Sequence, residues 1–171
     1  MTLVELFENK IYATDKQEHN YLKYYDEWFK QYKDKKITLL EIGVENGHSI
    51  KLWKDYFTKA SIYGMDINDG GYFKGDSTDP NQLLRQGLLR LKFDIIIDDG
   101  DHHPTSQAKT YMNMKDQLKS GGLYIIEDIA GPKYNNYIYE KEVDKIKSLG
   151  FELIDTDGKH TVSYLGVLKN Q

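Results

Sequence analysis

The chain has 171 residues, enough for one domain with a proper core, and it carries a net charge of −4. The absence of cysteine excludes disulfides and thiolate metal sites, and the acidic balance argues against a protein that binds nucleic-acid phosphates. No apolar run reaches membrane-spanning length and no signal peptide is recognisable, so we expect a cytoplasmic protein with no membrane partner.

Residues 1–34 predict a helical segment. A short helix is expected over 1–10, and Thr14 and Gln17 have the spacing of a capping box that opens a second helix. This second helix carries an aromatic stripe of helical period: Tyr21, Tyr24, Tyr25, Trp28, Phe29 and Tyr32. The stripe indicates core packing, and it would also suit a helical lid laid across the open end of a sheet.

From residue 35 onward, strand and helix signals alternate. Strands are expected at 37–42, 61–66, 72–77, 93–99, 123–126, 151–155 and 161–168. The Asp79–Pro80 pair predicts a helix start, and Leu83, Leu84, Leu88 and Leu91 are expected in the core. A helix from Pro104 is expected to present Ala108, Tyr111, Met112 and Leu118 on one side and to end at Gly121–Gly122. A further helix over 139–149 and an Asp157–Gly158 hairpin turn complete the pattern.

These signals predict an α/β fold. The sheet is expected to be Rossmann-like and doubly wound, with seven mainly parallel strands, an antiparallel C-terminal hairpin strand and an N-terminal helical cap. We find no repeat or linker, so residues 1–171 are expected to form one domain, with a lid over 1–34 and a core over 35–171.

Two features suggest a ligand site at the carboxyl ends of the strands. Gly43 and Gly47 lie between the first strand and a helix, where backbone can approach a ligand closely. Their spacing fits neither a P-loop nor the dinucleotide fingerprint. Asp66 ends the second strand about twenty residues later, a position that commonly binds ribose, although a helix cap is the alternative.

A cluster of acids and imidazoles follows the apolar strand at 93–99. Asp98, Asp99, Gly100, Asp101, His102 and His103 stand there in succession, and Glu127–Asp128 end the next strand. Carboxyl ends of neighbouring parallel strands share one sheet edge, so these side chains are placed for chemistry. The alternative is a solvated loop whose polar residues cap the next helix.

The motifs resemble those of the class I S-adenosylmethionine-dependent methyltransferases. The stretch 41–47 is similar to their first motif, Asp66 to their ribose-binding acid, and 75–77 to their adenine segment. More narrowly, 97–103 and 121–128 resemble the metal-dependent sugar O-methyltransferases that modify macrolide and aminocoumarin antibiotics. Thr14-Asp15-Lys16, His19 and Tyr21 are similar to that group as well. Two departures are Asp101, where the group usually has a small residue such as Ser, and a shorter chain.

The resemblance implies a set of site residues. Cofactor contacts are expected from Glu41, Gly43, Gly47, Ser49, Asp66, Asp76, Ser77 and Asp98. Asp99, Glu127 and Asp128 are the expected ligands of Mg²⁺ or another hard divalent cation, since they offer oxygen without thiolate. His102 is the candidate general base beside Asp99, with His103 as its rival.

The implied function is a metal-assisted O-methyltransferase that uses S-adenosylmethionine. The expected acceptor is a hydroxyl of a sugar, glycan or polyol, and a homo-oligomer would allow a partner to complete the pocket. A catechol or vicinal diol is the alternative acceptor, and a non-catalytic S-adenosylmethionine-binding module is the alternative function. An NAD-dependent oxidoreductase is disfavoured by the glycine spacing.

Overall fold

The computed structural model describes residues 1–9, 12–69, 73–130, 137–156 and 163–170. Its strands are β1 (Thr38–Ile42), β2 (Ser61–Asp66), β3 (Phe73–Lys74), β4 (Phe93–Asp98), β5 (Leu118–Ala130), β6 (Glu152–Asp155) and β7 (Ser163–Lys169). Its α-helices are α1 (Leu3–Asn9), α2 (Leu22–Phe29), α3 (His48–Tyr56), α4 (Pro80–Arg85), α5 (Pro104–Met114) and α6 (Tyr137–Ser148). Three short 3₁₀ turns are η1 (Asp15–Gln17), η2 (Leu88–Arg90) and η3 (Lys115–Gln117).

The seven strands form one sheet in the order β3-β2-β1-β4-β5-β7-β6. All neighbours from β3 to β5 are parallel, whereas β7 is antiparallel to both β5 and β6. The order reverses direction at β1 and β4, which is the switch point where open α/β sheets bind ligands. The predicted doubly wound fold with an antiparallel C-terminal hairpin strand is confirmed.

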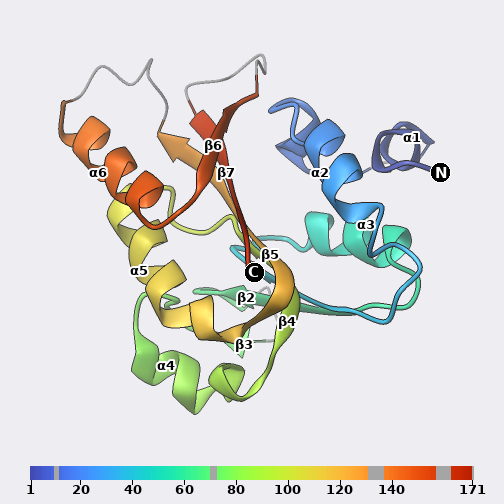
Figure 1. Ribbon diagram of the computed structural model, residues 1–171. Helices are drawn as coiled ribbons and strands as arrows, with labels where there is room; N and C mark the ends of the chain where they lie inside the picture. Colours follow the sequence, from blue (N-terminus) through green and yellow to red (C-terminus); the bar gives the residue numbers. More distant parts are fainter. Residues whose placement is uncertain (10–11, 70–72, 131–136, 157–162, 171) are drawn as a thin grey trace.

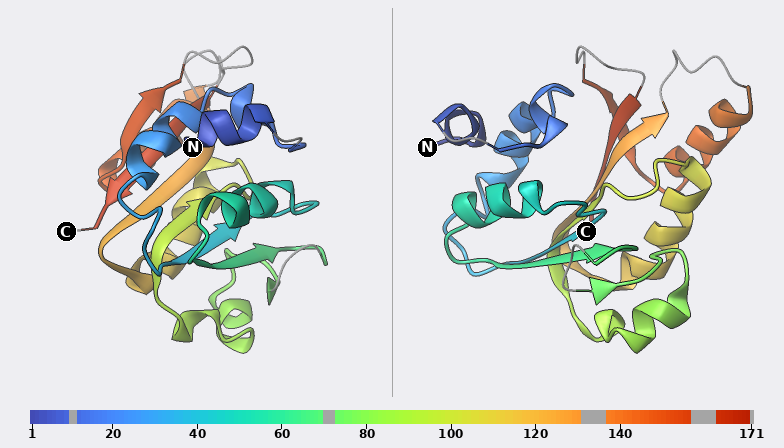
Figure 2. Two further views of the ribbon diagram at one scale, coloured as in Figure 1. Left: turned by 90° about the vertical axis from the view of Figure 1, so that its right-hand side faces the viewer. Right: turned by 180° about the vertical axis from the view of Figure 1, so that it is seen from behind.

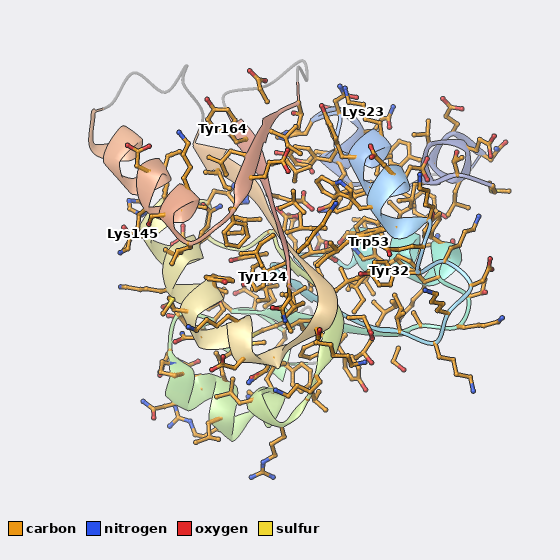
Figure 3. All side chains as sticks on the ribbon, viewed as in Figure 1. Lys23, Tyr32, Trp53, Tyr124, Lys145 and Tyr164 are labelled. Atoms are coloured by element: carbon orange, nitrogen blue, oxygen red, sulfur yellow. The ribbon has the colours of Figure 1, made fainter. Side chains whose placement is uncertain are left out.

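Helices cover both faces of the sheet, and each face has its own core. Figures 1 and 2 show α1, α2 and α3 on one side and α4, α5 and α6 on the other. Trp53 is fully buried in the first core and Tyr124 in the second (Figure 3). The aromatic stripe belongs to the first core, where the rings of Tyr25 and Phe29 lie 5.2 and 5.7 Å from that of Trp53. The stripe is therefore packing, as predicted.

The start of the second helix differs from the prediction. Thr14 makes no side-chain cap bond, and only the 3₁₀ turn η1 follows it before α2 begins at Leu22. Between them the chain turns again at Asn20, whose φ is +61°. The capping-box prediction is wrong because this segment bends to bury the side chain of Lys16, which the local pattern does not signal.

Strand β5 is much longer than predicted. Helix α5 ends at Met114, and Gly121–Gly122 lie inside β5, where they exchange backbone hydrogen bonds with Asn170. A Cβ on Gly122 would lie 2.8 Å from the carbonyl oxygen of Asp94, so glycine permits the close approach of β4. At its other end β5 continues to Ala130, because Ile129 and Ala130 pair with β7. The predicted helix stop and strand end are therefore both wrong.

The remaining boundaries agree closely with the sequence. Asp79 caps α4 by accepting a hydrogen bond from Asn81 N, and Pro80 is the first helical residue. Leu84, which was predicted in the core, is 54% exposed. Met112 is 49% exposed and so does not share the buried side of α5 with Ala108 and Tyr111, as was predicted. The Asp157–Gly158 turn lies outside the described residues. Among those that are described, every helix is too short or too polar to cross a membrane.

Adjacent leucines on α4 provide a test of this packing. Leu83 is fully buried and Leu84 is 54% exposed, so Leu83→Ala leaves a cavity whereas Leu84→Ala does not. We expect Leu83→Ala to lower the free energy of unfolding by about 2–5 kcal/mol and Leu84→Ala by less than about 0.5 kcal/mol. Urea denaturation of the two variants measures both values, and equal losses would contradict the described orientation of α4.

Candidate active site

The carboxyl ends of β1, β4 and β5 lie in register. Asp98 pairs with Ile42 of β1 on one side and with Ile126 of β5 on the other. Asp99 continues the ladder by one residue, since its N–H donates to the carbonyl of Ile42 at 2.8 Å. Asp99, which follows β4, and Glu127 and Asp128, which lie near the carboxyl end of β5, therefore reach the same sheet edge, as the sequence predicted.

A β-bulge orients the acids of β5. The pairing of β5 with β7 shifts between Ile126 and Ile129, and Glu127 and Asp128 lie in the irregular stretch. Asp128 has a φ of +51°, which is uncommon for a residue with a side chain. Bulges re-aim side chains next to functional sites, and this one is placed to send two successive carboxylates toward the same edge.

The turn after β1 approaches the turn after β4 closely. Gly43 has a φ of +83°, and a Cβ there would lie 2.0 Å from the carbonyl oxygen of Asp99. Asp66 braces the same turn from β2, because its Oδ2 accepts from Val44 N and Glu45 N, each at 2.9 Å. Burial opposes ionisation of Asp66, but backbone hydrogen bonds, including one from Asn68, outweigh it and lower its pKa. Gly43 and Asp66 thus shape the site.

Two cavities meet at this turn. The larger has a volume of about 650 Å³, which suits a nucleoside-sized ligand. Of the residues predicted for the site, it is lined by Gly43, Asp66, Asp76, Ser77, Asp99, His102 and Asp128. The smaller, of about 240 Å³, is lined by Ser49 and shares Asp15, Gly43, Glu45 and Asp99 with the larger.

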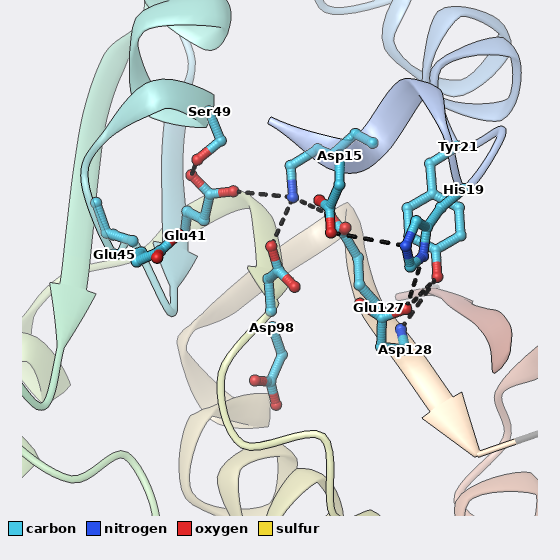
Figure 4. Close-up of polar contacts among 12 residues, drawn as sticks. Asp15, His19, Tyr21, Glu41, Glu45, Ser49, Asp98, Glu127 and Asp128 are labelled. Carbon is cyan, nitrogen blue, oxygen red and sulfur yellow. Dashed lines mark hydrogen bonds and ion pairs between the residues drawn. The ribbon is translucent and has the colours of Figure 1, made fainter. Parts of the chain in front are cut away.

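A buried lysine lies among the acids. The ammonium of Lys16 is 2.7 Å from Asp99 Oδ2 and 2.7 Å from Glu127 Oε1. It is also 3.4 Å from Glu41 Oε1, as drawn in Figure 4. Burial alone would lower the pKa of Lys16, but attraction to these three carboxylates raises it well above its usual value. Sequence reasoning noted Lys16 only within a motif and missed this contact.

The N-terminal segment also holds Asp128. Its Oδ1 accepts from the hydroxyl of Tyr21 at 2.8 Å and lies 3.0 Å from His19 Nδ1 (Figure 4). Burial opposes ionisation, but these two side chains, together with the nearby charge of His102, lower the pKa of Asp128. His102 Nε2 lies 3.7 Å from Asp128 Oδ2 and 3.4 Å from Asp99 Oδ1. The carboxylate of Asp128 is therefore held between the N-terminal segment, through His19 and Tyr21, and His102 of the loop after β4.

The three predicted metal ligands do not form one group. Among the described residues, two sets of potential ligands have all their ligand atoms within 4.8 Å of one another. One is Asp99, His102 and Asp128, which line the large cavity; the other is Glu41, Asp99 and Glu127, which surround Lys16. Asp99 belongs to both sets, whereas Glu127 and Asp128 are divided between them.

Two predicted cofactor contacts lie behind the cavity walls. Glu41 is buried, and its Oε2 accepts from Ser49 Oγ at 2.7 Å. Asp98 is only 2% exposed, and burial raises its pKa to about 7. Its Oδ1 accepts from Gly100 N, while its Oδ2 has no hydrogen-bond partner among the described residues. Neither residue lines the two cavities described above.

The two histidines after β4 have different positions. His103 caps α5, where its Nδ1 accepts from Thr105 N at 3.4 Å, whereas His102 lines the large cavity. Asp101, which precedes both, braces the loop at the start of α5, since it accepts hydrogen bonds from His103 N and from Ser106 Oγ. The geometry therefore favours His102 over His103 as the group that meets a ligand.

Comparison with known proteins gives a consistent picture. No protein-family model matches the chain. It is 29% identical over 161 residues to the 8-demethyl-8-alpha-L-rhamnosyl tetracenomycin-C 2'-O-methyltransferase of Streptomyces olivaceus. This match covers 85% of this chain and 43% of that protein. It is 32% identical over 126 residues to the demethylmacrocin O-methyltransferase of Streptomyces fradiae. This match covers 65% of this chain and 32% of that protein.

A solved structure matches nearly the whole chain. The MycE methyltransferase of the mycinamycin biosynthetic pathway, in complex with Mg, SAH and mycinamycin VI, superposes with a TM-score of 0.73 at 25% identity. The match covers 99% of this chain and 53% of that one. The chain is a homologue of the sugar O-methyltransferases. It has the class I methyltransferase fold, and it spans less than half the length of the curated relatives named above.

Titration of His102 tests the geometry of the acidic pocket. A hydrogen bond with Asp99 and the charge of Asp128, acting against burial, raise its pKa from 6.5 to about 9. In metal-free protein we expect NMR to show His102 titrating well above 6.5, and its pKa to fall in Asp99→Asn. Since the folded-state pKa is raised, His102 stabilises the fold fully below about pH 6.5 and stops doing so as the pH rises through about 9. An ordinary pKa in wild type would contradict the described contacts.

Proposed function

We propose that this chain transfers a methyl group from S-adenosylmethionine to a hydroxyl of a sugar, glycan or polyol, assisted by a divalent cation. The observation that carries the proposal is the large cavity itself. A glycine turn and Asp66 lie at one part of its wall, and Asp99, His102 and Asp128 lie together at another. A nucleoside site and a set of acid–base groups thus open into one space. The names of the relatives support methyl transfer and a sugar acceptor.

The cofactor would occupy the larger cavity. Asp66 would accept hydrogen bonds from the ribose hydroxyls, because its carboxylate lines the wall and is held in place by backbone amides. Asp76 and Ser77 line the part expected to meet the adenine. Gly43 keeps the wall open to the ligand. Ser49 would contribute from the smaller cavity, whereas Glu41, Gly47 and Asp98, which line neither cavity, would support the proposed cofactor site from behind its wall.

The acidic residues fit a hard divalent cation such as Mg²⁺. The donors are carboxylates with one imidazole and no thiolate, and Asp99, His102 and Asp128 line the cavity. Asp99 and Asp128 would hold the ion, with Glu127 as the third carboxylate of the proposed set. When bound, such an ion lowers the pKa of an acceptor hydroxyl and fixes its oxygen.

His102 would take the proton from the acceptor hydroxyl. Its imidazole is half-exposed at the cavity wall and is oriented by Asp99 through Nε2. To act as a base, the imidazole of His102 must be neutral. The charges of Asp99 and Asp128 favour its protonated form, so their effect on His102 must be weakened before it can accept a proton. Sharing both carboxylates with a cation has that effect. Methyl transfer is an in-line displacement, so holding the acceptor oxygen in position is a large part of the rate enhancement.

We infer the class of the methyl acceptor from the names of the relatives and not from the shape of the cavity. A catechol would meet the same acids and the same imidazole, because its vicinal hydroxyls also suit a metal-centred site. The relatives named for rhamnosyl tetracenomycin and demethylmacrocin favour a sugar-bearing acceptor. A small-molecule or glycan acceptor is therefore proposed.

Cofactor binding is the direct test of the proposed function. Calorimetry should detect S-adenosylhomocysteine binding to the wild type, and Asp66→Ala should weaken it by roughly 10- to 100-fold through lost charge-assisted hydrogen bonds. Asp69→Ala is the matched control, because Asp69 is an exposed acid three residues away that pairs with Lys74 at the surface. If the wild type binds neither this compound nor S-adenosylmethionine, the methyltransferase proposal fails.

The two adjacent histidines separate base catalysis from loop structure. With a methylatable acceptor in hand, His102→Ala should lower turnover by roughly 10²- to 10⁴-fold and leave cofactor affinity nearly unchanged. His103→Ala removes the α5 cap, so it should lower stability while turnover is retained. Steady-state methyl transfer with radiolabelled cofactor measures both. Wild-type turnover in His102→Ala would rule out its role as base.

A further inference from the structure

The carboxylates at the sheet edge already surround one cation, which is part of the chain. Lys16 is fully buried, although lysine is seldom buried without partners. The ligand atoms of Glu41, Asp99 and Glu127 lie within 4.8 Å of one another, a spacing that suits a metal ion. The ammonium contacts all three. Lys16 therefore stands where this inner set would otherwise hold an ion.

The ammonium engages one side of each neighbouring carboxylate. It binds Asp99 through Oδ2, which leaves Oδ1 facing His102. The hydrogen bonds that Glu127 accepts from Lys16 and Tyr25 both fall on Oε1. Asp128 shows the same arrangement, since His19 and Tyr21 contact its Oδ1 while Oδ2 faces His102. A short N-terminal segment thus binds one oxygen of each acid, and in Asp99 and Asp128, which line the large cavity, the other oxygen faces His102.

The position of Lys16 is fixed by its own segment. Its carbonyl accepts from Tyr21 N at 2.9 Å, which closes the turn that follows η1. Before this turn, the Tyr12 hydroxyl donates to Asp55 of α3 at 2.7 Å. Within the turn, Asn20 Nδ2 donates to the carbonyl of Thr156 at 2.7 Å. These bonds tie the segment to the body of the domain and fix the backbone from which the Lys16 side chain extends.

Charge explains why the cluster needs this residue. Glu41 and Glu127 are buried and Asp99 is partly buried, so three like charges converge out of water. Such carboxylates repel one another and are costly to ionise without a counter-charge. One ammonium in hydrogen-bond contact with two of them and in ion-pair range of the third offsets this repulsion.

We propose that Lys16 is the positioning residue of the acidic cluster, a built-in cation that fixes Glu41, Asp99 and Glu127 and keeps divalent ions out of the space among them. An ion is thereby confined to the cavity side, where Asp99, His102 and Asp128 meet. The confinement rests on the proposed function, whereas the exclusion of ions around Lys16 does not.

Metal uptake without turnover tests the proposal. Mn²⁺ binding is counted by calorimetry and by paramagnetic resonance in the wild type, in Lys16→Met and in Lys30→Met. Lys30 is an exposed lysine at the end of α2 and serves as the matched control. We expect Lys16→Met to take up one more Mn²⁺ per chain than the wild type, and Lys30→Met to match the wild type.

Thermal unfolding supplies a second readout that a merely space-filling role would not give. In EDTA, Lys16→Met should melt roughly 10 °C below the wild type, because it leaves buried carboxylates unpaired. Mn²⁺ should recover more of this loss than sodium chloride of equal ionic strength. Lys16→Arg, which keeps the charge, should retain the ion count of the wild type. Lys16→Gln, which keeps polar contact without charge, replaces Lys16→Met if the latter accumulates poorly.

The outcomes distinguish this proposal from the proposed function. If the wild type takes up no Mn²⁺ and Lys16→Met takes up one, the role of Lys16 stands and metal assistance falls. If both take up one ion, with equal melting temperatures in EDTA, the role of Lys16 is refuted and metal assistance stands. Failure of both neutral variants to fold even when they are purified in Mn²⁺ also counts against the proposal, which predicts that the ion replaces the ammonium.

Discussion

The active-site edge of this domain depends on the contact between one ammonium and three carboxylates. Parallel strand ends bring Glu41, Asp99 and Glu127 together, and like charges at that distance repel unless they are balanced. Lys16 supplies the balance from outside the sheet. The N-terminal segment is thereby joined to this sheet edge by charge as well as by the apolar packing of α2 on α3.

The same arrangement explains how a small domain can place the proposed cation site beside the proposed nucleoside site. The glycine turn after β1 touches the loop after β4, and Gly43 and Asp99 both line the large cavity into which the two proposed sites open. The bulge in β5 places Glu127 and Asp128 in succession, one associated with Lys16 and the other with His102.

Much of this was predictable from the sequence, because strand ends and glycine turns are local features. The apolar stretch before Asp98, the glycines after Glu41 and the acid at Asp66 indicate the sheet edge and its cavity. The role of Lys16 was not predictable in this way, because its partners lie 25, 83 and 111 residues along the chain, as the numbering of Glu41, Asp99 and Glu127 shows. The bulge was missed for a similar reason, since pairing with β7 decides how far β5 continues.

Anomalous diffraction from crystals grown with S-adenosylhomocysteine and Mn²⁺ tests the account most directly. We predict one manganese peak on the cavity side of the cluster, in contact with Asp99 and Asp128, with the Lys16 ammonium still between Asp99 and Glu127. A cofactor-bound structure without such a peak, or with manganese in the space among Glu41, Asp99 and Glu127 and Lys16 displaced, would contradict it.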